Sequence, residues 1–290
     1  MLSSILRFPN RGPYGDARYR GNCSGYVGTL LADWLKPKNA WDPMAGSGSV
    51  VQGLQASGVY VVGTDLRQGV DILSTDDDLA LPVGIDLGFL HPPYWDIVTY
   101  NDDPRCLSRT QPYDRFIHQL NDALCRLFGA LRSGGHLAVL VGDVVKAGRI
   151  YPIVRDIDWL GTPIRLFIKE QHRCASDARP YPGEVVRIAH EYLVVTRKPV
   201  AIAFPIRTTR WSRSDIRQRT DIPWRSLVAT ALETLGGETT LPVLYQWIAE
   251  CAKTKDRPNW QAKVRQTLQL APEFVSSTRG VWKVAARSAA

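Results

Sequence analysis

A glycine-rich turn between a short apolar strand and a helix is the feature that most constrains the fold of this 290-residue chain. It lies in the stretch Asp42-Pro43-Met44-Ala45-Gly46-Ser47-Gly48-Ser49. Residues 48–57 have helical apolar spacing, Gly58 ends that helix, and residues 59–63 read as a short buried strand. One β-α-β unit of this kind is the smallest nucleotide-binding element. The turn therefore predicts an α/β fold of the Rossmann type.

The glycines and a nearby carboxylate predict a ligand site at this turn. Gly46 and Gly48 let the chain turn sharply and let a ligand approach the backbone, and the following helix offers free N–H groups. Asp65 ends the next strand, where a carboxylate can accept hydrogen bonds from two ribose hydroxyls. The turn has no positive charge and no Gly-Lys-Ser/Thr, so a methionine-bearing cofactor fits better than a triphosphate. A tight turn without a ligand is the alternative.

A second turn, about forty residues later, follows another predicted strand at residues 86–90. Its sequence is His91-Pro92-Pro93-Tyr94-Trp95. Two prolines fix the backbone and leave their carbonyls outside the sheet hydrogen bonds, where they can accept from an exocyclic amine. Tyr94 offers a flat ring on which an extruded base can stack. The alternative is a rigid loop with a core tyrosine.

Strands and helices alternate along the first two thirds of the chain. Helical spacing is found at residues 26–35 and 116–131, and strand composition at residues 136–141, 165–170 and 191–197. This alternation, with glycine-rich connections, predicts a parallel sheet. We expect a domain at residues 1–205 that begins with an irregular basic arm, residues 1–25. A basic linker at residues 206–222 follows, with Arg207, Arg210, Arg213, Arg217 and Arg219.

Residues 223–290 have the pattern of a second, small domain. Helices are expected at residues 224–235, 241–251 and 259–270, followed by a hairpin whose tip carries Arg279. Three helices and a hairpin are the plan of a winged helix. The last helix buries one face and presents a polar one: Gln261, Lys263, Arg265, Gln266 and Gln269. Gln and Arg are suited to base edges in a major groove, whereas a solvated face or a protein contact is the alternative.

The composition narrows the classes of possible partner but does not identify one. The net charge of +8 is compatible with a polyanionic partner but is not specific for one. Five scattered cysteines without C-x-x-C spacing predict reduced thiols and argue against disulfides and a zinc site, so we expect no metal. Without an apolar run of about 20 residues or a signal-peptide core, we expect a cytoplasmic protein with no membrane partner.

Asp42-Pro43-x-x-Gly46-Ser47-Gly48 and His91-Pro92-Pro93-Tyr94 together resemble the DNA amino-methyltransferases, which methylate adenine N6 or cytosine N4 using S-adenosylmethionine (SAM). Residues 131–137, 142–146 and 190–198 fit as well, and the motif order resembles the gamma arrangement. The resemblance implies SAM as cofactor, double-stranded DNA as partner and the second turn as catalytic. The implied cofactor residues are Asp42, Pro43, Ala45, Gly46, Ser47, Gly48, Asp65, Leu66, Asp71 and Cys23. The DNA candidates are Arg210, Arg213, Gln261, Lys263, Arg265, Gln266 and Arg279.

His91 departs from that family, which usually has Asp, Asn or Ser at this position. A neutral imidazole has one acceptor nitrogen and an imidazolium has none. We therefore expect neutral His91 to accept one hydrogen of the target amine while the Pro92 carbonyl accepts the other, with activity falling near pH 6.5 as His91 protonates. A His91 that only braces its loop is the alternative, and we expect Glu191 and its neighbour His190 to be structural.

The predicted function is site-specific DNA methylation, with adenine N6 ahead of cytosine N4. Two other interpretations stay open: a winged-helix DNA-binding protein whose catalytic site has decayed, and an RNA methyltransferase. The loop at residues 96–112 is expected to cover the site or touch DNA through Tyr100 or Arg105, or to be a plain solvent loop. A homodimer and a cognate nuclease of a restriction-modification system are further partners that the sequence leaves open.

Overall fold

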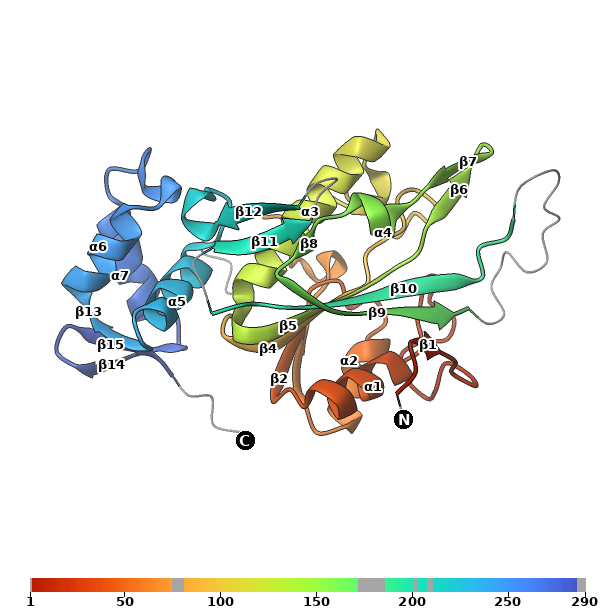
Figure 1. Cartoon of the computed structure of the whole chain (residues 1–290), viewed down its shortest axis with the longest axis horizontal. Coiled ribbons are helices and arrows are strands. Elements are labelled where there is room, and N and C mark those ends of the chain that lie inside the picture. The colour runs from red at the N-terminus through yellow and green to blue at the C-terminus, as the bar shows by residue number, and fades with distance from the viewer. Residues whose placement is uncertain (1, 75–80, 172–185, 201–202, 208–210, 286–290) are drawn as a thin grey trace.

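A seven-stranded mixed sheet forms the centre of the molecule in the computed structural model, which describes residues 2–74, 81–171, 186–200, 203–207 and 211–285 (Figure 1). The strands lie in the order β1-β9-β10-β5-β4-β2-β3. Their bounds are Ile5–Leu6 (β1), Asn39–Asp42 (β2), Tyr60–Gly63 (β3), Ile85–Leu90 (β4), Leu131–Val141 (β5), Thr162–Glu170 (β9) and His190–Arg197 (β10). The α/β, Rossmann-like fold expected from the sequence is confirmed.

The prediction of a wholly parallel sheet is wrong. Strands β2, β3, β4 and β5 are mutually parallel, but β10 runs antiparallel to both β5 and β9. Strand β10 pairs with β9, the strand that precedes it in the chain, and with β5, and both pairs are antiparallel. The apolar residues of β10 can be buried in either strand direction, so its composition did not indicate its orientation.

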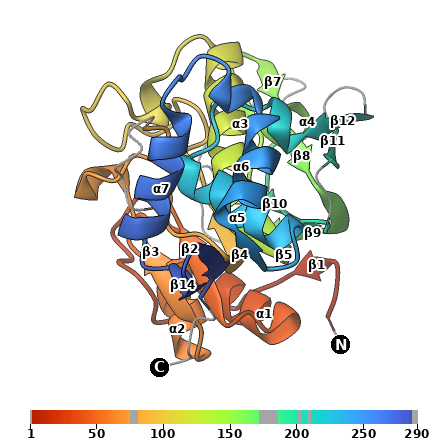
Figure 2. The same cartoon turned by 90° about the vertical axis from the view of Figure 1, so that its left-hand side faces the viewer.

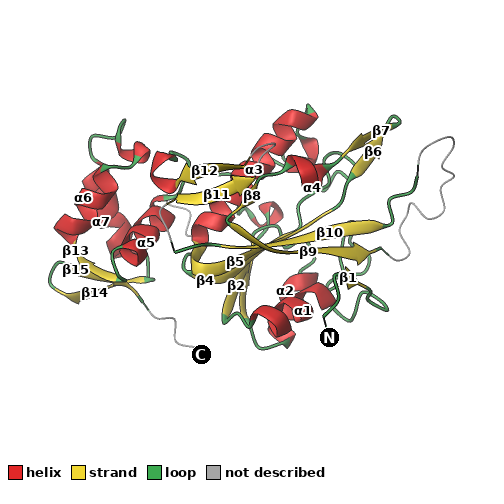
Figure 3. Ribbon diagram, in the orientation of Figure 1, coloured by secondary structure: helices red, strands yellow, loops and turns green. Residues whose placement is uncertain are grey.

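Helices cover both faces of the sheet (Figure 3). Helices α1 (Tyr26–Leu35) and α2 (Ser49–Ala56) pack on one face, where Val27, Leu31 and Leu54 join Phe167 of β9 in one buried cluster. Helix α3 (Tyr113–Ala130) and the short α4 (Ile153–Asp156) belong to the larger cluster on the other face. Among the described residues, no helix is both long and apolar enough to cross a lipid bilayer.

Helices α1 and α2 meet at glycines. A methyl group added to Gly53 of α2 would lie 2.1 Å from the carbonyl oxygen of Gly25, and one added to Gly28 of α1 would lie 2.5 Å from that of Val50. Both contacts are with backbone atoms that cannot move aside alone. This close crossing fixes α2, and with it the glycine-rich turn from which α2 begins.

We expect Gly53→Ala to lower the free energy of unfolding by about 2 kcal/mol, because the new methyl group overlaps the Gly25 carbonyl. Urea denaturation followed by circular dichroism measures the change. Gln55→Ala, an exposed position on the same helix, is the matched control. Equal stability of the two variants would contradict the close crossing.

The segment predicted as a basic linker is a strand hairpin, so that prediction is wrong. Strands β11 (Ala203–Arg207) and β12 (Trp211–Asp215) pair with each other, and β11 also pairs with β8 (Trp159–Leu160). After the hairpin, the guanidinium of Arg217 pairs with Asp215 at 2.6 Å and Glu250 at 2.7 Å, and Arg219 pairs with Asp221 at 2.6 Å. Arg213 lies in β12, and Arg210 falls outside the described residues.

The C-terminal unit contains the three predicted helices and the predicted hairpin. They are α5 (Trp224–Thr234), α6 (Leu241–Ala249), α7 (Trp260–Leu270), β14 (Phe274–Thr278) and β15 (Val281–Val284). A third strand, β13 (Glu238–Thr240), pairs with β15 and was not predicted. Helix α5 packs against α3 and β5, so Trp224 and Leu227 share one buried cluster with Leu127 of α3.

This unit sits at the amino ends of the parallel strands (Figures 1 and 2). Glu233 of α5 accepts hydrogen bonds from the N–H and the hydroxyl of Ser133, both at 3.0 Å, near the start of β5. Val284 of β15 lies beside Gly84, which comes just before β4. The two predicted turns, by contrast, follow the carboxyl ends of β2 and β4.

Candidate active site

A pocket lies at the carboxyl ends of β2, β3 and β4. Ligand sites of open α/β sheets lie at this edge, so the position is typical of a cofactor pocket. All of the predicted cofactor residues except Gly48 line it: Cys23, Asp42, Pro43, Ala45, Gly46, Ser47, Asp65, Leu66 and Asp71. His91, Pro92 and Pro93 line it as well, whereas Tyr94 is not among its lining residues.

The N-terminal arm lies on the glycine-rich turn. Gly46 and Gly48 have positive φ angles of 54° and 80°, and a methyl group on Gly46 would lie 2.9 Å from the Tyr19 ring. The Ser49 hydroxyl donates to the Asn22 side chain. Tyr19 and Asn22 therefore complete the pocket wall, and Tyr19 was absent from the prediction. Apart from β1, the arm is irregular as expected.

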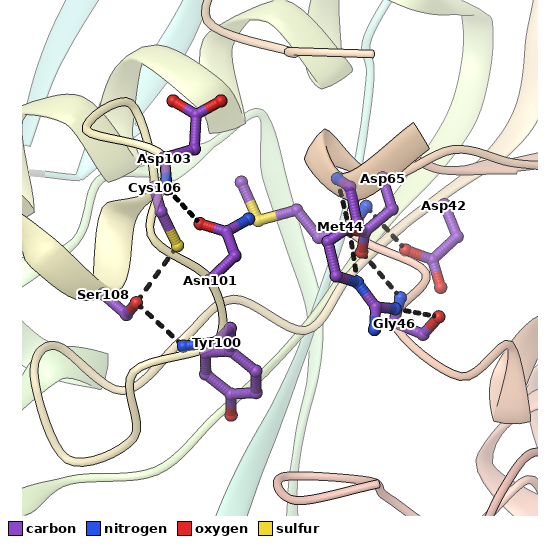
Figure 4. A network of polar contacts seen from close by, with 10 residues as sticks. Asp42, Met44, Gly46, Asp65, Tyr100, Asn101, Asp103, Cys106 and Ser108 are labelled. Atoms are coloured by element: carbon purple, nitrogen blue, oxygen red, sulfur yellow. Dashed lines mark hydrogen bonds and ion pairs between the residues drawn. The ribbon is translucent and has the colours of Figure 1, made fainter. Parts of the chain in front are cut away.

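The Asp65 carboxylate is already largely engaged. Its Oδ2 accepts from the Gly46 N–H at 2.9 Å, and its Oδ1 accepts from the Arg67 N–H at 3.0 Å and from Arg67 Nε at 3.1 Å (Figure 4). A carboxylate has about four acceptor positions, so one remains. The Arg67 guanidinium also donates to the Gly46 carbonyl at 2.7 Å. Binding two ribose hydroxyls on Asp65 therefore requires Arg67 to release Oδ1.

Asp42 is a buried carboxyl group in the pocket wall. Its Oδ1 accepts a hydrogen bond from the Met44 N–H at 3.1 Å. Burial raises the pKa of Asp42 to about 7, because the charged form loses its hydration. Near neutral pH this residue is therefore poised between its acid and its carboxylate, and a cation bound beside it would favour the carboxylate.

The loop at residues 96–112 lines the pocket opposite the glycine-rich turn. This position agrees with the predicted role of covering the site. Tyr100 and Arg105 both line the pocket. The loop is held by its own contacts: the Tyr100 N–H donates to the Ser108 hydroxyl at 3.4 Å, and the Asp103 N–H donates to the Asn101 side chain at 3.1 Å (Figure 4). Arg105 also lies 4.0 Å from Asp71, the carboxylate expected near the adenine end of the cofactor.

His91 belongs to a chain of buried polar groups behind the catalytic turn. Its Nε2 lies 2.9 Å from the Tyr94 hydroxyl, which donates to Glu191 Oε1 at 2.7 Å. Glu191 Oε2 accepts from Lys169 Nζ at 2.6 Å. Among the described residues, Nδ1 of His91 and the carbonyl of Pro92 make no hydrogen bond. Two acceptors thus stay available at the point where β4 enters the pocket.

Electrostatics keep His91 neutral. Burial lowers its pKa below 6.5, and the nearby Glu191 carboxylate offsets only part of that effect. The acid limb expected near pH 6.5 from the sequence is therefore expected at a lower pH. Burial alone would raise the pKa of Glu191, but the Lys169 charge and the hydrogen bonds from Lys169 and Tyr94 hold it at about 2. Burial, followed by the Glu191 charge, raises the pKa of Tyr94 well above 10.

Tyr94 and Glu191 make contacts that the sequence did not indicate. The hydroxyl of Tyr94, the residue expected to offer a stacking face, is bound to Glu191, and its ring lies against Gly142, where an added methyl group would be 2.8 Å away. Glu191, expected to be structural, connects to His91. The signal was a charge on the buried face of β10, since Glu191 alternates there with Leu193 and Val195. Lys169 lies directly opposite Glu191 on β9.

The predicted DNA contacts of α7 and of the β14–β15 hairpin lie away from the pocket. On α7, Arg265 and Gln266 are exposed, Gln261 and Lys263 are half-buried, and Arg279 is exposed at the tip between β14 and β15. These five residues belong to the C-terminal unit at the other end of the sheet (Figure 1). The described residues contain no group of three or more His, Cys, Asp or Glu side chains arranged to hold a metal ion.

The similarities between this chain and known proteins are weak. No family model and no curated protein matches the chain. It is 28% identical to the structure of a candidate DNA modification methylase from Thermus thermophilus, over 41% of this chain and 49% of that one, with a TM-score of 0.28. The SAM complex of that methylase gives 26% identity, coverages of 41% and 50%, and a TM-score of 0.27.

An N-methyltransferase, NodS from Bradyrhizobium japonicum in complex with S-adenosyl-L-homocysteine, is 12% identical over 63% of this chain and 90% of that one, with a TM-score of 0.34. The chain spans about half the length of the Thermus methylase. These TM-scores are too low to support conclusions about the pocket of this chain.

Proposed function

We propose that this chain is a SAM-dependent DNA methyltransferase that transfers the methyl group to the exocyclic amine of a base extruded from the duplex. Adenine N6 is the first candidate and cytosine N4 the second. One observation carries the proposal: a glycine-rich cofactor turn and two adjacent residues with unpartnered acceptors, His91 and Pro92, line one pocket. An exocyclic NH2 has two hydrogens, and this pair of acceptors matches them.

The residues of the pocket fit SAM. Asp65 has an acceptor for a ribose hydroxyl, and Asp42 can face the ammonium of the methionine end. Bound SAM would supply an electrophilic methyl group.

The chain's own residues would orient and then deprotonate the amine. His91 Nδ1 and the Pro92 carbonyl each accept one amine hydrogen, which turns the nitrogen lone pair out of the ring and toward the cofactor. As the N–C bond to the methyl group forms, the S–C bond of SAM would break and S-adenosyl-L-homocysteine would leave, so the amine nitrogen would become cationic. It loses one proton to His91 Nδ1, and the Glu191 carboxylate, 4.0 Å from the imidazole, stabilises the resulting charge.

We infer that the C-terminal unit is a winged helix that contacts DNA through the polar face of α7. Its position gives it a particular role. Because the unit docks at the amino ends of β4 and β5, α7 would hold the duplex at a distance from the extruded base. Elements beside the pocket would then contact the target base pair, among them the exposed hairpin of β6 (Val144–Lys146) and β7 (Arg149–Tyr151).

Expression in a host without DNA methylation, followed by genomic sequencing with base-modification detection, tests the proposed function. We expect one modified base in a defined sequence, and none in cells expressing His91→Ala. Unmodified DNA together with labelled methyl groups in RNA would instead favour an RNA methyltransferase. SAM binding without transfer to any nucleic acid would favour a DNA-binding protein with a decayed site.

SAM affinity is expected to rise severalfold from pH 6 to pH 8, by less than the change in Asp42 ionisation, because an α-amino group itself loses its proton near pH 8. With a pKa of about 7, Asp42 changes over this interval from roughly one tenth to nine tenths ionised, and an ammonium binds the ionised form. Affinity is therefore lost as the pH falls through 7. Isothermal titration calorimetry at both pH values measures the change.

Two controls accompany this titration. Asp42→Asn should bind SAM weakly and with little change between pH 6 and pH 8. Adenosine, which lacks the ammonium, should bind the native chain equally at both pH values. A native affinity for SAM that is the same at both values would show that the ammonium does not lie beside Asp42.

A further inference from the structure

We infer that Tyr94 and Glu191 are positioning residues that hold His91 in the tautomer with hydrogen on Nε2, so that Nδ1 remains the acceptor for the target amine. The inference rests on the proposed function for its catalytic meaning, but the tautomer itself is a property of the free protein. Neither residue lines the pocket, so their effect on the substrate would pass through His91 alone.

The direction of each hydrogen bond follows from Lys169, which lies at one end of this series of buried polar groups. Lys169 and Glu191 are directly paired across β9 and β10, both are buried, and their charged atoms lie 2.6 Å apart. An ionised carboxylate only accepts hydrogen bonds, so the Tyr94 hydroxyl must donate its hydrogen to Glu191 Oε1, 2.7 Å away. The Tyr94 oxygen is then left as an acceptor.

His91 must complete the chain as a donor. Its Nε2 lies 2.9 Å from the Tyr94 oxygen, whose own hydrogen is committed to Glu191. A neutral imidazole carries one hydrogen, so placing it on Nε2 leaves Nδ1 bare. The same logic, in which a buried carboxylate sets the tautomer of a catalytic histidine, operates in hydrolase triads, although here a phenol stands between the two groups.

Reversing the direction of these hydrogen bonds would remove the acceptor from the site. If the Tyr94 hydroxyl donated to His91 Nε2, the imidazole hydrogen would move to Nδ1. An N–H would then face the amine hydrogens, and the hydrogen bond that turns the lone pair outward would be lost. A histidine at this position is therefore a workable acceptor only when a group behind it fixes the tautomer, whereas Asp or Asn accepts without such help.

The full-length chain labelled with ¹⁵N-histidine allows the tautomer to be read directly. Long-range ¹H–¹⁵N correlation spectra separate imidazoles protonated on Nε2 from those protonated on Nδ1, and the missing signals of His91→Asn assign the His91 ring. We expect Nε2–H in the native chain. In Glu191→Gln, the new amide can donate to the Tyr94 oxygen, so we expect His91 to shift toward Nδ1–H. In Tyr94→Phe, we expect a mixture.

Kinetics on the same variants link the tautomer to catalysis. Tyr94→Phe and Glu191→Gln should lower kcat at least about tenfold while KM for SAM stays within about twofold. Tyr192→Phe removes a hydroxyl from the next residue of β10, outside the buried chain, and is the matched control. Thermal unfolding verifies the fold, and if Glu191→Gln fails to fold, Tyr94→Phe decides the result.

The two readouts separate failure of this inference from failure of the proposed function. A native His91 with hydrogen on Nδ1, or a tautomer unchanged in both folded variants, would overturn the inference whatever the activity. Suppose instead that the native chain has Nε2–H, that the variants alter this tautomer, and that the chain methylates no DNA. This result would support the positioning role and would contradict only the proposed function.

Discussion

Replacing His91 with alanine should lower methyl transfer by about 10²- to 10³-fold while leaving SAM affinity within about twofold. Removing one well-placed group that acts on the reacting atom typically costs this much. His91 sits at the end of β4 beside the Pro92 carbonyl, so its loss leaves one acceptor for two amine hydrogens. Single-turnover rates at saturating SAM and DNA measure the effect apart from binding.

Two further variants make this result specific to His91. His118→Ala changes an exposed histidine of α3 and should leave the rate unaltered. His91→Asn supplies an amide oxygen as acceptor and should retain more activity than His91→Ala. A parallel fall in SAM affinity and rate, with no advantage for His91→Asn, would instead mean that His91 only braces its loop.

Replacing Asp65 with asparagine should weaken SAM binding by about a hundredfold. Asp65 holds the glycine-rich turn through the Gly46 N–H, holds Arg67, and offers the remaining acceptor for a ribose hydroxyl. Removing one charge from a hydrogen-bonded pair costs about 3 kcal/mol, which corresponds to that loss of affinity. Calorimetric titration with SAM at pH 8 measures it.

Arg67→Ala distinguishes the two roles of Asp65. The Arg67 side chain occupies one acceptor position of Oδ1, while the backbone N–H of residue 67 keeps the other. Arg67→Ala therefore leaves two free positions on the carboxylate, one on each oxygen, and should bind SAM at least as tightly as the native chain. Asp33→Asn, an exposed carboxylate on α1, is the control for a simple change of charge. Native affinity in Asp65→Asn would exclude the carboxylate from the cofactor site.

The two turns could be predicted from the sequence because local residues determine them. Glycines with positive φ and a Pro-Pro pair at the ends of apolar strands have few other conformations, and the parallel strands place both turns at one edge of the sheet. The three C-terminal helices were predictable for a similar reason, since each has one apolar face.

What the sequence left unpredicted depends on pairing between distant strands. The direction of β10 follows from its partners, and its apolar residues fit either orientation. The hairpin of β11 and β12 resembled a linker because arginines and Pro205 mask the strand pattern. The link from Glu191 to His91 could be recognised only from the strand register that places Glu191 opposite Lys169. The docking of α5 could be recognised only from the complete fold.

Transfer of a tritiated methyl group from SAM, measured with the purified chain on duplex DNA and on RNA, tests the central claim most directly. Mass spectrometry of the digested nucleosides then identifies the product. We predict label in duplex DNA, recovered as N6-methyladenine or else N4-methylcytosine, and none with His91→Ala. Label in RNA alone, or SAM binding without transfer to duplex DNA, would contradict the account.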